Sequence, residues 1–242
     1  MTTVTDGAAD PVLGVLGGMG PAATADFLLR LARLTRAECD QDHVPTIVYS
    51  DPRTPDRSDA ILGRGPDPLP AMIRGIEFLD RAGCALIAIP CNTAHHWYED
   101  LARGSSVPIL HIADAAAREL RSLLTSRKVG ILATDGTVRS GIYQARLDAA
   151  GFTTVDLTDL GDGNPVMRGI RAMKSGQDAA GRDALMAGGR TLVRRGADAL
   201  LIACTDVSAA LVDVTSLEQV PVLDASTCLA RASLAKLGKH SW

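Results

Sequence analysis

The sequence has few aromatic residues, no long apolar run and no closely paired cysteines. Phe, Trp and Tyr make up 3% of the 242 residues, so the core must be built from Ala, Leu, Val and Ile. That composition favours helices packed closely on a sheet over a β-sandwich. No stretch approaches the roughly 18 consecutive apolar residues of a membrane helix. The five cysteines are scattered and form no CxxC pair, which argues against a disulfide framework or a thiolate zinc cluster.

Charge is also nearly balanced along the chain. The formal net charge is -3 at pH 7, and the sequence has no long basic run. It therefore lacks the clustered Lys and Arg residues that are typical of nucleic-acid-binding proteins. Residues 1–11, MTTVTDGAADP, lack the basic and apolar regions of a signal peptide and are expected to form a flexible leader. We therefore expect a cytoplasmic protein that binds neither nucleic acid nor membranes.

Short apolar segments alternate with longer segments of helical periodicity. Strands are predicted at VLGVLG, TIVYS, ALIAIP, VPILHI, KVGILAT, TTVDL, ALLIAC and VPVLD. Strands that are apolar throughout are typical of parallel sheets covered by helices on both faces. Intervening segments such as AATADFLLRLARLTRAE and PLPAMIRGIEFLDRAG have apolar residues at helical spacing. The order indicates an α/β fold.

The two halves of the chain resemble each other. LGVLGGMGP corresponds to VGILATDGT, and RAGCALIAIPCNT corresponds to RRGADALLIACTD. In this alignment Cys91 and Cys204 occupy equivalent positions, each at the end of a buried strand. Open α/β sheets bind ligands at that end of their strands. We predict two pseudo-symmetric Rossmann-like lobes with mainly parallel sheets and an active site between them. The first lobe would comprise 12–112 plus 225–242, and the second 113–224.

Two opposed thiols fit a specific chemistry. Moving a proton from one face of a carbon to the other requires an acid/base group on each side, and a thiol with a pKa of about 8.5 is close enough to neutrality for loop amides to favour the thiolate. A single free cysteine is more often inert and buried. The duplicated placement of Cys91 and Cys204 favours the catalytic interpretation, whereas Cys39, Cys84 and Cys228 are interpreted as packing or surface thiols.

The chain resembles the cofactor-independent aspartate/glutamate racemases, and the aspartate racemase branch in particular. The resemblance runs from about Leu13 to about Asp224 through GVLGGMGPAATADF, DPRTPDRSDAILGRGPDP, PCNTAHHWYEDL, ILATDGTVRSGIY, GIRAMKSG and ACTDVS. It implies a homodimer that racemises a small acidic amino acid without a cofactor or metal. Relatives that decarboxylate arylmalonates keep only the second cysteine, so the pair favours a racemase.

The resemblance also implies a set of site residues. Cys91 and Cys204 match the acid/base cysteines, Arg57 matches a residue that holds a substrate carboxylate, and Lys174 matches a second cationic contact. Met19 and Gly20 would lie at the cleft. Backbone or side-chain groups of Asn92, Thr93, Thr137 and Thr205 could bind the α-carboxylate and stabilise developing charge.

Several alternatives remain open. From local sequence alone, Arg57 could form a surface salt bridge with Asp56 or Asp59, and Lys174 could simply end a helix. The loop GVLGGMGP lacks the spacing of a dinucleotide site. His95 and His96 point about 100° apart on a helix and cannot both bind one metal with Cys91, so they are interpreted as local structure, although one of them could tune the thiol.

Two residues depart from the family pattern, and two other functions stay possible. Asp206 stands where many relatives have glutamate, and Asp135 where relatives often have a small or hydroxylated residue, so the substrate could differ. The alternative functions are a cofactor-independent isomerase or decarboxylase of a small dicarboxylate, and a two-lobed binding module without turnover.

Overall fold

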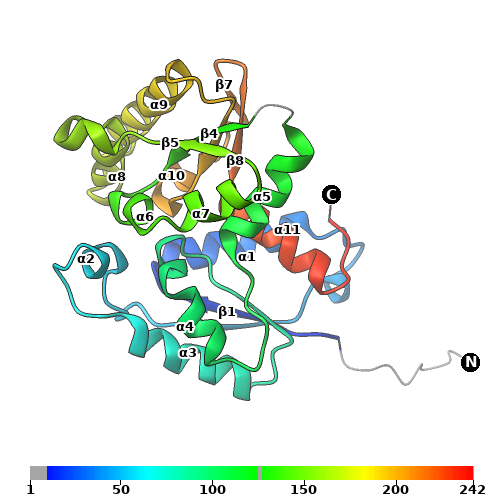
Figure 1. The fold of residues 1–242 in the computed structure, drawn as a ribbon. Coiled ribbons are helices and arrows are strands. Elements are labelled where there is room, and N and C mark those ends of the chain that lie inside the picture. The colour runs from blue at the N-terminus through cyan, green and yellow to red at the C-terminus, as the bar shows by residue number, and fades with distance from the viewer. Residues whose placement is uncertain (1–9, 125–126, 242) are drawn as a thin grey trace, which may run out of the picture.

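The structure is a computed structural model that describes residues 10–124 and 127–241. Most of the expected leader, residues 1–9, lies outside the described chain. Strands and helices alternate along the chain. The strands form two sheets, one in each half of the chain (Figure 1). Within the described residues, no helix is both long and apolar enough to cross a bilayer.

The first sheet has three parallel strands in the order β2-β1-β3. They are β1 (Leu13–Gly17), β2 (Thr46–Ser50) and β3 (Leu86–Ala88). The strand predicted at VPILHI is wrong as a regular strand: it is reduced to one parallel bridge, between Ile87 and Ile109. The chain turns away there because α5 begins at Ile112, so the segment stays beside β3 only briefly.

The second sheet has five strands in the order β5-β4-β6-β8-β7. They are β4 (Lys128–Leu132), β5 (Thr153–Val155), β6 (Ala199–Ile202), β7 (Ser216–Leu217) and β8 (Val220–Asp224). All neighbours are parallel except β7 and β8. The two-residue strand β7 is not predicted by the sequence pattern. The other strand predictions are confirmed, with differences of at most two residues at their ends.

Helices connect the strands and cover both sheets. They are α1 (Pro21–Leu34), α2 (Arg57–Ile61), α3 (Leu69–Arg81), α4 (Tyr98–Arg103), α5 (Ile112–Leu123), α6 (Asp135–Ser140), α7 (Ile142–Ala149), α8 (Pro165–Lys174), α9 (Asp178–Arg194), α10 (Thr205–Ala210) and α11 (Ala225–Lys236). Short 3-10 helices lie at η1 (Asp40–Asp42), η2 (Thr93–Trp97) and η3 (Thr158–Gly163). The fold is therefore the predicted α/β architecture.

The two halves share a continuous apolar core. One cluster includes Leu13 and Phe27 of the first half together with Val129, Tyr143 and Leu201 of the second. The C-terminal helix α11 packs against α1 and α5, and α5 packs against α7 (Figure 1). Burial of this shared apolar surface holds the halves together. The division at residues 113 and 225 stays a prediction.

Candidate active site

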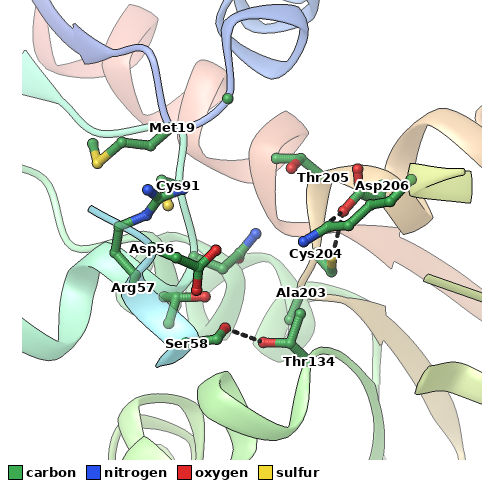
Figure 2. A pocket seen from close by; sticks show the side chains of 14 residues that line it. Met19, Asp56, Arg57, Ser58, Cys91, Thr134, Ala203, Cys204, Thr205 and Asp206 are labelled. Carbon is green, nitrogen blue, oxygen red and sulfur yellow. Dashed lines mark hydrogen bonds and ion pairs between the residues drawn. The ribbon is translucent and has the colours of Figure 1, made fainter. Parts of the chain in front are cut away.

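A cavity of about 220 Å³ lies between the two lobes, and both predicted thiols line it. Cys91 follows β3 of the first lobe and Cys204 follows β6 of the second, where it is the N-cap of α10. Each cysteine is 7% exposed, and Figure 2 shows them on opposite sides of the view. The cavity is smaller than the roughly 300–1,000 Å³ typical of drug-sized ligands, so it suits a small molecule.

The glycine-rich loop after β1 brings Met19 and Gly20 to the cavity. It can do so because Gly18 has a φ of +87° and an added Cβ there would collide with the backbone of Asp51. The Gly18 amide donates to Thr24 Oγ1 at 2.9 Å, which ties the loop to α1. Only glycine adopts this conformation without strain, so the loop closes tightly enough to form one wall of the cavity.

Arg57 is held in place by the backbone rather than by a surface salt bridge. Its Nη1 donates to the carbonyl oxygens of Thr54 and Pro55, at 3.1 and 2.9 Å. Its Nε is buried without a hydrogen-bond partner, and the residue lines the cavity. A buried, unpaired N–H of a guanidinium is costly. An anionic ligand in the cavity would satisfy it.

Lys174 and Asp206 lie on the other side of the cavity, close to Cys204. Lys174 Nζ is 4.0 Å from Asp206 Oδ2, and Cys204 Sγ is 3.9 Å from the same oxygen. Burial raises the pKa of the Asp206 carboxyl, and the Lys174 cation opposes that rise. Lys174 is thus more than a helix C-terminal residue, because its charge lies against the acid beside the second thiol.

The surroundings of Cys204 favour its neutral thiol form. Burial, and after it the Asp206 carboxylate, raise the pKa of Cys204 to about 12. From the sequence, loop amides are expected to favour a thiolate. Hydrogen bonds from the backbone of Val207 and Asp206 do lower the pKa of this thiol, but they do not outweigh its desolvation next to a negative charge.

Asn92, Thr93 and Thr205 line the cavity as expected, whereas Thr137 does not. Thr137 is 1% exposed, and its hydroxyl lies 2.8 Å from Thr93 Oγ1 and 3.0 Å from Thr134 Oγ1. It therefore lies behind the cavity surface, supporting two residues that reach it.

Several residues that line the cavity are not predicted from the sequence. They are Asp56, Ser58, Thr134 and Ala203. Ser58 Oγ is 3.3 Å from Thr134 Oγ1, a contact between α2 of the first lobe and the N-cap of α6 in the second (Figure 2). A usable signal existed: Thr134 falls in the ATDGT segment that the internal duplication pairs with the glycine-rich loop.

The two histidines belong to local structure. His95 is 2% exposed, its Nε2 lies 3.1 Å from the carbonyl oxygen of Ile89, and burial lowers its pKa to about 4. Its Nδ1 is buried without a partner, and His96 is exposed. The idea that one of them tunes Cys91 finds no hydrogen bond to support it. Within the part of the chain that the structure describes, no three His, Cys, Asp or Glu side chains form a metal-binding group.

Known proteins resemble this chain over nearly its whole length. A family profile described as Asp/Glu/Hydantoin racemase matches residues 16–233. The broad specificity amino-acid racemase RacX of Bacillus subtilis is 31% identical over 228 residues, which cover 93% of this chain and 97% of RacX. The Picrophilus torridus aspartate racemase structure is 33% identical with a TM-score of 0.84, covering 96% of each chain.

More distant structures share the fold. Glutamate racemase from Francisella tularensis, solved in complex with D-glutamate, is 14% identical with a TM-score of 0.66 and covers 94% of this chain and 81% of its own. At that identity the likeness concerns the fold alone. The family profile and the two relatives above show that the chain belongs to the Asp/Glu/Hydantoin racemase family and is an isomerase.

Proposed function

We propose that the chain interconverts the L and D forms of aspartate, or of a close acidic amino acid such as glutamate, without pyridoxal phosphate. The observation that carries the proposal is the pair of buried thiols, Cys91 and Cys204, that reach one small cavity from opposite lobes. The names of the relatives support the substrate class, since one is an aspartate racemase and another acts broadly on amino acids.

The proposed reaction uses both thiols in each direction. One cysteine, as thiolate, takes the α-proton of the amino acid and becomes a thiol. The electron pair left on the α-carbon delocalises into the carboxylate, and the opposite thiol then donates its proton to the other face and becomes a thiolate. Burial and the Asp206 carboxylate favour the neutral thiol of Cys204, which suits this cysteine to the role of proton donor.

The charges around the cavity support an acidic substrate. Arg57 and Lys174 supply positive charge on the two sides, so each carboxylate of a dicarboxylic amino acid can meet one cation. Asp56 and Asp206 also line the cavity, and a carboxylate is the natural partner of the α-ammonium group. Asn92, with the threonines beside both thiols, would hold the α-carboxylate and stabilise its growing charge.

Isotope exchange tests the proposal directly. Each enantiomer of aspartate and glutamate is incubated with the enzyme in D₂O, and α-deuterium is followed by NMR while chiral chromatography follows inversion. We expect both for at least one acidic amino acid. Replacing Cys91 or Cys204 by Ala should lower the racemisation rate by about 10²- to 10⁴-fold, the usual contribution of a positioned acid or base. If α-deuterium exchange persists when both Cys91 and Cys204 are replaced by Ala, the two-thiol mechanism is refuted.

Two further assays, of decarboxylation and of binding, separate the alternatives. CO₂ release from a substituted malonate, without α-exchange of any amino acid, would favour a decarboxylase. Saturable binding of aspartate with neither exchange nor inversion would favour a binding module.

We also propose a homodimer, which the resemblance implies. The cytoplasmic location and the division into lobes at residues 113 and 225, both expected from the sequence, are proposed as well. Sedimentation equilibrium should give twice the mass of the chain. A monomer at micromolar concentration would contradict the dimer.

A further inference from the structure

Tyr143 is a fully buried tyrosine whose hydroxyl points at the neighbour of Cys91. It lies on α7 of the second lobe with 0% exposure. Its hydroxyl donates a hydrogen bond to Asn92 Oδ1 in the first lobe. Burial raises the pKa of Tyr143 well above its ordinary value, and the cysteines and Asp224 around it add to the rise. The hydroxyl therefore keeps its proton and remains a donor.

Asn92 has a side chain with two different ends. Its carboxamide has an oxygen that only accepts and an NH₂ that only donates. The residue is 4% exposed and lines the cavity directly after Cys91. Because Oδ1 is occupied by the Tyr143 hydroxyl, the NH₂ end is the one left to meet a ligand. A carboxylate, which only accepts hydrogen bonds, fits that end.

The second lobe holds the next residue in the same way. Thr93 Oγ1 lies 2.8 Å from Thr137 Oγ1 of α6. Two consecutive residues after Cys91 are thus fixed by hydroxyl groups of the opposite lobe. The position of residues 91–93 therefore depends on how the two lobes pack against each other.

We infer that Tyr143 is a positioning residue for racemisation, which acts by fixing the Asn92 carboxamide with its N–H groups toward the substrate carboxylate. The inference rests on the proposed function, because it assigns Asn92 a carboxylate partner. In the reaction, negative charge on that carboxylate grows as the α-proton leaves, so a preoriented donor stabilises the transition state more than the bound substrate.

Replacing Tyr143 by Phe removes the hydroxyl and keeps the ring. Asn92 Oδ1 then loses its partner in a buried place, and the carboxamide can rotate away from its donor orientation. We expect kcat to fall about tenfold to a hundredfold, with KM changed by less than about threefold. A merely structural role would lower the melting temperature without this split between kcat and KM.

A double-mutant cycle shows whether Tyr143 acts through Asn92. With Asn92 already replaced by Ala, the Tyr143→Phe change should alter kcat by less than about twofold, since the group that it orients is gone. An equal loss of kcat in both backgrounds would overturn the inference, and so would an unchanged kcat in Tyr143→Phe alone.

Tyr98→Phe is the matched control. The Tyr98 hydroxyl donates to the carbonyl oxygen of Ile109 at 3.1 Å, within the first lobe and apart from the cavity residues. It should lose a similar hydrogen bond and keep kcat.

An NMR measurement on the ligand-free protein separates failure of this inference from failure of the proposed function. Faster hydrogen exchange or a shifted resonance of the Asn92 side-chain NH₂ is expected in Tyr143→Phe and not in Tyr98→Phe. If the wild-type enzyme racemises no amino acid, the proposed function fails. The NMR measurement still tests the hydrogen bond between Tyr143 and Asn92 in that case. If the wild type is active and the Asn92 resonance does not change, the inference fails alone.

Discussion

Replacing Asp206 by Asn should lower the pKa of Cys204 and make this thiol more reactive. The carboxylate lies 3.9 Å from the sulfur and disfavours its negative charge. Asparagine has nearly the same shape, carries no charge and can donate a hydrogen bond to a thiolate. Both differences favour the thiolate form of Cys204.

The size of the effect follows from the distance between the two groups. Two unit charges about 4 Å apart interact by about 4 kcal/mol at an effective dielectric constant near 20, and by about 1 kcal/mol in water. The Asp206 side chain is 34% exposed, so solvent screens part of the interaction. With about 1.4 kcal/mol for a tenfold change, the pKa of Cys204 should fall from about 12 to roughly 11 or below.

Thiol–disulfide exchange with a small disulfide reagent measures this change. At a fixed pH near 8, below the pKa of both variants, the thiolate fraction rises tenfold when the pKa falls from about 12 to about 11. A less basic thiolate is a weaker nucleophile, with a Brønsted slope of about 0.4–0.5. We therefore expect Cys204 to react about threefold faster or more in Asp206→Asn. Peptide mass spectrometry separates Cys204 from exposed Cys39 and the other cysteines.

Asp56→Asn is the control for this measurement. Asp56 lines the same cavity and caps α2 by accepting from the Asp59 amide, a role that asparagine also fills. It should leave Cys204 unchanged within about twofold. An unchanged or slower reaction of Cys204 in Asp206→Asn would refute the electrostatic reasoning, and equal acceleration in both variants would point to a general opening of the cavity.

Two further predictions concern stability and the lobe contact. The pKa of buried His95 is about 4 rather than 6.5, so its contribution to stability is present above about pH 6.5 and is lost as pH falls toward 4. The free energy of unfolding in urea should be about 2 kcal/mol lower at pH 4.5 than at pH 7 on this account, and His95→Gln should remove that part; an undiminished pH dependence in His95→Gln would contradict it. Gly136→Ala would place a Cβ 2.7 Å from Ser58 Oγ and 2.9 Å from Ser58 Cα, which forces α2 away from α6 beside Arg57. Racemisation should fall at least tenfold by the D₂O assay, whereas Gly163→Ala, with open space around it, should behave as wild type; equal activity of the two variants would show that the contact is dispensable.

The fold could be predicted from the sequence because apolar strands without alternation require cover on both faces. The same signal failed at residues 107–112, since composition does not say how long a segment stays beside its neighbour. Ile109 makes one bridge to Ile87 before the chain turns into α5. The two-residue strand β7 is too short to carry any periodicity.

The candidate site could be predicted where it depends on the duplication and on the resemblance, and not where it depends on contacts between distant segments. Both thiols reach one cavity, as the internal repeat indicates. In contrast, the hydrogen bond from Tyr143 to Asn92 and the approach of Lys174 to Asp206 join residues whose spacing in the sequence carries no signal. Thr137 was assigned to the cleft because it lies in a matching motif, but its hydroxyl is turned to Thr93 behind the surface.

The duplication makes the two thiols equivalent in the backbone, but their surroundings are different. In the alignment of the halves, Thr93 falls at the position that Asp206 occupies after Cys204. Two residues after Cys91 there is therefore the hydroxyl of Thr93, hydrogen-bonded to Thr137. Two residues after Cys204 there is the carboxylate of Asp206, 3.9 Å from the cysteine sulfur. A racemase that uses two thiols needs one of them protonated and the other deprotonated whenever substrate binds. On the proposed mechanism, burial and, after it, the Asp206 carboxylate keep the proton on Cys204 in the resting enzyme. The symmetry of the fold thus places the two acid/base groups, and the carboxylate beside only one of them favours Cys204 as the first proton donor.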